Sequence, residues 1–149
     1  AALIFNSALI IGGVFNFFFA LGLRVYLPRT SLTSIGTVIV IGGGASLALI
    51  GIFTEDLSTV HTIVSFGFFL LLPVGLLLIG MGTWGGRMSL LTIATGIAAL
   101  FSILALPIVL GGLEVGFAVP EIIEALILSA WIVVMAARLL QGKGIASPA

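Results

Sequence analysis

The chain has 149 residues, of which 61% are hydrophobic and only 7% are charged. Soluble domains carry about 25% charged residues, so this composition excludes a water-soluble globule. The formal net charge is zero and the few basic residues form no cluster, which argues against binding to nucleic acid. There is no cysteine, which excludes disulfides, thiolate metal sites and thiol nucleophiles.

Five apolar runs are long enough to cross a bilayer, which takes about 20 residues in a helix. Because they lack the strict alternation of barrel strands, they predict transmembrane helices. The predicted helices are 1–23, 35–53, 60–81, 88–110 and 122–140. We therefore predict an all-α integral membrane protein, with a single bundle of five transmembrane helices over residues 1–140 and a solvated, cytoplasmic tail at 141–149.

The first predicted helix carries its two amides and its small residues on one stripe: Asn6, Gly13, Asn16 and Ala20. Such a stripe is typical of a surface that packs against neighbouring helices. A ligand-binding role for Asn6 and Asn16 is the alternative. Similar small-residue faces occur in the second and fourth predicted helices, so we expect contacts with other membrane subunits as well as with membrane lipids.

The connection between the second and third helices holds the only histidine of the chain, His61, close to Glu55 and Asp56. Ser65 follows His61 by four residues and therefore lies on the same face of the helix. Acids near a helix N-terminus are stabilised by the helix dipole, so structural caps are the simpler interpretation. A working site, with Ser65 among its ligand-binding candidates, is the alternative.

Two further acids, Glu121 and Glu124, lie near the start of the last predicted helix. They are three residues apart and share a helix face. Pro120 precedes them, and we expect it at the first helical position or just before it, where a missing N–H costs nothing. Pro107 lies near the end of the fourth predicted helix, which we expect to continue to residue 110.

The charges separate when successive helices alternate in direction. All five basic residues fall on one side of the membrane, and all five acids fall on the other side with His61. Short loops rich in Lys and Arg face the cytoplasm. The C-terminus is therefore predicted to be cytoplasmic, and the acidic turns at 54–61 and 111–121 are predicted to lie outside the cell membrane. We also expect a sixth helix before Ala1, which would return the N-terminus to the cytoplasm.

Three segments carry a resemblance to a known family: LIFNSALIIGG (3–13), GIFTEDLSTVH (51–61) and PEIIEALILSAWIVVMAARLL (120–140). Together they resemble the prokaryotic membrane family catalogued as domain of unknown function 998. The resemblance implies a compact helical bundle with one more helix, at its N-terminus, than this chain contains. The family name records no activity, so the resemblance supplies no function.

The resemblance also singles out individual positions. Asn6 matches an asparagine of the family pattern, and His61 matches a histidine that follows an acidic turn. Glu121 or Glu124 matches a glutamate that opens the last helix, and Trp131 matches a tryptophan that follows it.

Two functional classes account best for these features. The first is a non-catalytic bundle, either a small subunit of a membrane complex such as a respiratory assembly or a lipid-binding protein. The second is an intramembrane enzyme that acts on lipid at the outer leaflet. In that enzyme His61 would be the general base, Asp56 or Glu55 would orient it, and Glu121 or Glu124 would be the acid. The small-residue faces and scarce polar groups favour the non-catalytic class.

Two other classes have less support. A transporter usually binds its substrate near the bilayer midplane, where the five predicted helices place no charged residue. Catalytic zinc sites usually use two or three histidines, and this chain has one. We therefore expect no metal and no cofactor.

Overall fold

The computed structural model describes residues 2–54, 57–109, 117–143 and 145, and within these ranges it contains helices and no strand. The helices are α1 (Ala2–Tyr26), α2 (Ser31–Ile52), α3 (Ser58–Gly82), α4 (Arg87–Leu104), the short α5 (Leu106–Val109) and α6 (Ala118–Leu140). All but α5 are long and apolar enough to cross a membrane, which makes five spans. The predicted fold class, an all-α membrane bundle, is confirmed.

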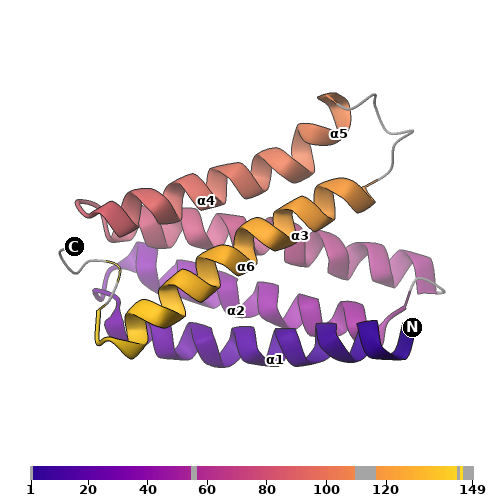
Figure 1. Ribbon diagram of the computed structural model, residues 1–149, viewed down its shortest axis with the longest axis horizontal. Coiled ribbons are helices and arrows are strands. Elements are labelled where there is room, and N and C mark those ends of the chain that lie inside the picture. Colours follow the sequence, from indigo (N-terminus) through magenta and orange to yellow (C-terminus); the bar gives the residue numbers. More distant parts are fainter. Residues whose placement is uncertain (1, 55–56, 110–116, 144, 146–149) are drawn as a thin grey trace.

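The first four long helices pack in sequence, with α1 against α2, α2 against α3 and α3 against α4. The last helix packs chiefly on α4 and touches α1 and α3 only in part. In Figure 1, α6 runs obliquely across the bundle, from the end where α3 begins to the end where α1 finishes. In that view α6 crosses α3 near the middle of the bundle, and the two helices diverge towards the ends of the molecule.

Small residues bring the helix backbones together in the first three helices. A Cβ added at Gly13 would lie 2.5 Å from the carbonyl oxygen of Gly44, and one added at Gly36 would lie 2.9 Å from that of Gly75. No side chain fits at such distances. The stripe predicted for the first helix is buried here, with Asn16 and Ala20 beside Gly13, so this small-residue face is used within the bundle.

The second long helix begins four residues earlier than predicted, because the preceding loop caps it. The side chain of Thr30 accepts a hydrogen bond from the backbone N–H of Thr33, and the Thr33 hydroxyl bonds back to the Thr30 backbone. This reciprocal pair satisfies two N–H groups that lack partners inside the helix. The Thr33 side chain is fully buried.

The predicted end of the fourth helix was wrong. The helix stops at Leu104, Ala105 caps it, and α5 continues as a separate turn. Pro107 explains the break, since its ring clashes with the carbonyl four residues earlier and it has no N–H to donate.

The predicted start of the last helix was also displaced. Phe117 is the N-cap and α6 begins at Ala118, so Pro120 is the third helical residue rather than the first. This position is tolerated because the first four N–H groups of a helix have no partner within it. The first bond of α6 runs from the Glu121 N–H to the Phe117 carbonyl at 2.9 Å.

A side-chain hydrogen bond joins α6 to α4. The Trp131 Nε1–H donates to the Thr92 hydroxyl oxygen at 3.0 Å. Trp131 is buried and also meets the ring of Phe19 on α1 edge to face, with 5.8 Å between ring centroids. Trp131 therefore anchors α6 at the middle of the bundle.

Candidate functional site

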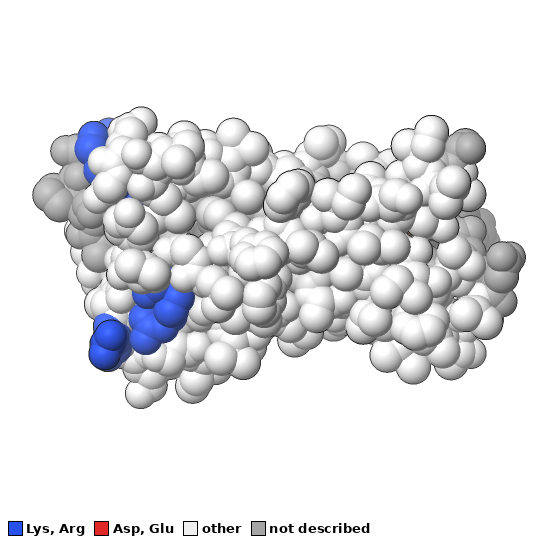
Figure 2. All heavy atoms as spheres, turned by 90° about the horizontal axis from the view of Figure 1, so that it is seen from below, with Lys and Arg blue, Asp and Glu red and all other residues white. Residues whose placement is uncertain are grey.

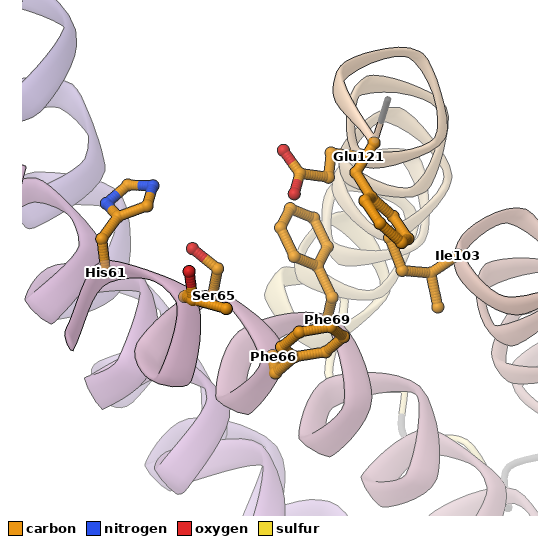
Figure 3. Close-up of a pocket in the computed structure, with 8 residues that line it drawn as sticks. His61, Ser65, Phe66, Phe69, Ile103 and Glu121 are labelled. Atoms are coloured by element: carbon orange, nitrogen blue, oxygen red, sulfur yellow. The ribbon is translucent and has the colours of Figure 1, made fainter. Parts of the chain in front are cut away.

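A cavity of about 190 Å³ lies at the end of the molecule where α3 and α6 begin. Residues from α3, α4 and α6 line it, together with the residue that caps α6. Half of the lining is polar and half is apolar: His61, Thr62, Ser65 and Glu121, and Phe66, Phe69, Ile103 and Phe117. Figure 3 shows this arrangement.

His61 lies in the first turn of α3, and its ring is held by the preceding loop. Its Nδ1 lies 2.8 Å from the carbonyl oxygen of Phe53. A carbonyl oxygen can only accept, so Nδ1 carries the proton and donates it. In the neutral ring Nε2 then bears the lone pair. The partner that orients His61 is thus a backbone carbonyl at the end of α2.

The sequence prediction that Ser65 shares a face with His61 agrees with the cavity lining, because the two residues and Thr62 all line it. In Figure 3 both labelled side chains project from the same side of α3. One turn separates them, as expected for residues four apart. A hydroxyl and an imidazole are therefore presented to the same small volume.

Glu121 reaches the cavity from the opposite helix. It lies in the first turn of α6 and is half-buried. Figure 3 shows its carboxylate directed from α6 towards the side of the cavity where His61 and Ser65 lie. The structure therefore brings together residues separated by some sixty positions in the sequence.

Glu124 has a different environment from Glu121, although the two were expected to share a face. Glu124 is fully buried, on the side of α6 that also buries Leu128, Trp131 and Met135. Neither of its carboxyl oxygens has a hydrogen-bond partner in the described part of the chain. It is not among the residues that line the cavity.

The two amides proposed as ligand-binding candidates are not among the residues that line the cavity. Asn16 is buried under α2, where its Oδ1 would be 2.7 Å from a Cβ at Gly44 and has no described hydrogen-bond partner. The backbone carbonyl of Asn6 lies beneath Gly51, so Asn6 forms part of the α1–α2 contact. Glu55 and Asp56 lie outside the described residues.

Aromatic residues form the apolar half of the cavity, and sequence reasoning missed them. The rings of Phe66 on α3 and Phe117 before α6 stand 6.4 Å apart at 71°. Phe69 follows one turn deeper and is almost fully buried. Their spacing offered a signal, since Phe66 follows Thr62 and Phe69 follows Ser65 by four residues, so that both continue the same helix face.

The charged residues of the molecule are distributed asymmetrically around this cavity. All five Lys and Arg side chains belong to the opposite end: Arg24, Arg29, Arg87, Arg138 and Lys143. Figure 2 shows the basic side chains of one face gathered at a single end. Along α6, Glu121 and Arg138 are separated by about 26 Å at 1.5 Å per residue. No described basic side chain can therefore reach the cavity.

A second hollow lies between α4 and α6 and is almost entirely apolar, with a volume of about 630 Å³. Its lining includes Ala98, Phe101 and Ile123. The hydroxyl of Ser102, the polar residue in this lining, is already donated to the Ala99 carbonyl at 2.7 Å. This groove therefore presents hydrocarbon to the membrane and no chemistry to a ligand.

Candidate metal ligands are dispersed. Within the described ranges, no three or more His, Cys, Asp or Glu side chains lie close enough together to hold a metal ion. The cavity has one imidazole and one carboxylate, which is fewer protein ligands than a zinc site uses.

Comparison with known proteins adds a family and no activity. A family model described as "Protein of unknown function (DUF998)" matches residues 1–138. No curated protein and no solved structure matches the chain.

Proposed function

Since the chain belongs to the DUF998 family, whose description names no activity, we propose its function from the geometry of the cavity. We propose that this polytopic membrane protein is a lipid-binding protein, which holds the polar head of an amphiphile between α3 and α6. The observation that carries the proposal is the divided lining, in which an imidazole, two hydroxyls and a carboxylate face four apolar side chains.

The size of the cavity indicates how much of the ligand enters it. Pockets that enclose a whole drug-sized molecule measure about 300–1,000 Å³, whereas this one measures about 190 Å³. It therefore has room for a head group and the first few chain atoms. Phe66 and Phe117 are both partly exposed beside it, so the remaining chain would continue over their rings into the surrounding lipid.

Native mass spectrometry of the purified protein in a maltoside detergent tests this proposal. The wild-type protein should retain a phospholipid-sized adduct from its membrane, and Ser65→Phe should lose it because the new ring occupies the cavity. Ala98→Phe, which fills the apolar groove instead, is the matched control and should retain the adduct. Equal retention by the two variants would place the lipid elsewhere and contradict the proposal.

One observation favours an intramembrane lipid hydrolase as the second candidate. The Phe53 carbonyl holds Nδ1 of His61, which leaves Nε2 as the base, and the Ser65 hydroxyl lines the same cavity. An oriented imidazole beside a hydroxyl is the arrangement of an activated nucleophile. Release of fatty acid from an added diacyl lipid, abolished in both Ser65→Ala and His61→Ala, would support it. Binding of the lipid without its hydrolysis would contradict the hydrolase and leave lipid binding as the only proposed function.

We further propose that the cavity opens at the outer face of the cell membrane. The basic residues at the opposite end support this orientation through the positive-inside rule. The chain has no native cysteine, so single cysteines can report the side. A membrane-impermeant maleimide should label Thr54→Cys in intact cells and leave Lys143→Cys unlabelled until the cells are broken. The reverse labelling pattern would show that the protein has the opposite orientation in the membrane.

A further inference from the structure

We propose that the amphiphile bound between α3 and α6 carries an ammonium group in its head. This inference rests on the proposed lipid-binding function and names the chemistry that the site selects. Three features of the cavity point to it: aromatic rings in its wall, a carboxylate on one side and the distance to every described basic side chain.

The aromatic wall suits a cation. Phe66, Phe69 and Phe117 all line the cavity, and the first and last of these rings meet at 71° with centroids 6.4 Å apart. Rings set at such an angle offer π-electron density from two directions. A cation within about 6 Å of a ring centroid is attracted by the ring quadrupole, and aromatic cages of this kind recognise quaternary ammonium groups.

The carboxylate of Glu121 supplies the opposite charge. It reaches the cavity from α6, while the aromatic residues Phe66 and Phe69 come from α3. An ammonium group placed between the two helices would therefore meet rings on one side and a carboxylate on the other. His61 is the other titratable group in the lining, and its Nδ1–H is already donated to the Phe53 carbonyl.

The distribution of basic residues argues against a head that is only anionic. Proteins bind phosphate and carboxylate groups mainly through Arg and Lys. The nearest basic residue on α6, Arg138, is about 26 Å from Glu121 along the helix. An anionic head in the cavity would instead face the Glu121 carboxylate, while the Lys and Arg side chains lie at the opposite end of the molecule.

Two sources could supply this chemistry: the choline or ethanolamine head of a phospholipid, or a free long-chain amine. Two probe pairs distinguish them. The first pair is dodecylphosphocholine and the analogue in which 3,3-dimethylbutyl replaces choline, which has the same shape without the positive charge. The second pair is dodecylamine and dodecanol. Binding of each probe to the delipidated protein in maltoside micelles is measured by native mass spectrometry across a concentration series.

We expect the ammonium member of at least one pair to bind about tenfold more tightly than the partner that lacks the ammonium group, which is within the range of a desolvated cation–π contact. A preference confined to the first pair identifies a phospholipid head, and one confined to the second identifies a free amine. Equal binding within both pairs would overturn the ammonium inference and leave lipid binding intact. Binding of no probe at all would contradict the proposed function itself.

Matched variants tie the preference to the cavity. Glu121→Gln and Phe117→Leu should each reduce the preference for the ammonium probe severalfold, while binding of the uncharged dodecanol stays unchanged. Phe101→Leu removes an exposed ring from the apolar groove and should change neither. If Phe101→Leu reduced the preference as much as Phe117→Leu, the charge effect would come from the micelle surface and the inference would fail.

Discussion

The helix interfaces of this protein fall into two kinds. The closed interfaces, α1–α2 and α2–α3, bring backbones together over glycine, as at Gly13 and Gly36. The open interface, between α3 and α6, is lined by Phe66, Phe69 and Phe117 and encloses the cavity. Small side chains allow helices to approach until no space remains, whereas large rings hold them apart. Under the proposed function, packing and ligand binding therefore belong to different helix pairs of one bundle.

The largest effect should come from breaking the anchor that holds α6 over the cavity. Trp131→Ala removes a buried ring and its hydrogen bond to Thr92. Replacing a buried aromatic by Ala costs about 3–5 kcal/mol, which we expect as the loss in free energy of unfolding in mixed detergent and dodecyl sulfate micelles. Since α3 and α6 share few direct contacts, loss of the α6–α4 contact should also displace α6 from the cavity and abolish lipid binding.

Trp84→Ala is the matched control for this prediction. Trp84 is 72% exposed in the turn before α4, and a surface substitution of this kind changes stability by about 0.5 kcal/mol or less. Equal destabilisation by the two variants would mean that the burial of Trp131 contributes nothing specific to the stability of the bundle.

An intermediate effect should follow from one methyl group in a closed interface. In Gly36→Ala the new Cβ would lie 2.8 Å from a side-chain carbon of Ile79 and 2.9 Å from the Gly75 carbonyl oxygen. Overpacking of this kind costs about 1–3 kcal/mol, measured by the same unfolding assay. Gly22→Ala, where nothing lies within 4 Å of the added Cβ, should be neutral or slightly stabilising. A neutral Gly36→Ala would show that α2 and α3 can separate at no cost.

The smallest effect on stability should come from filling the open interface. Ser65→Phe adds a ring to a space that already exists, so the free energy of unfolding should change by about 1 kcal/mol or less. The same variant should lose the bound lipid, which would separate ligand binding from stability. A large loss of stability would instead show that the cavity is too small or too rigid to accept a ring.

Several features of the candidate site could be read from the sequence. The shared face of His61 and Ser65 follows from helical spacing, and both line the cavity. The spacing of Glu121 and Glu124 also predicted a shared face, yet one carboxylate lines the cavity and the other is fully buried. Three residues turn a helix by about 300°, so the two side chains do not point in the same direction. The oblique path of α6 then decides which neighbours each carboxylate contacts.

The sequence by itself determined the membrane class and the five spans, because the hydrocarbon core demands long apolar helices whatever their neighbours are. It also predicted that the acids and the basic residues lie at opposite ends of the bundle, and the described residues Glu121, Glu124 and all five Lys and Arg agree with this. Only the tertiary structure decided that Phe117, a residue outside any predicted helix, stands beside Phe66. Such a contact joins two segments whose hydropathy is evaluated separately. It depends on the angle at which α6 crosses the bundle. Contacts between distant helices, such as those of Trp131 with Thr92 and Phe19, are likewise not encoded by any local pattern in the sequence.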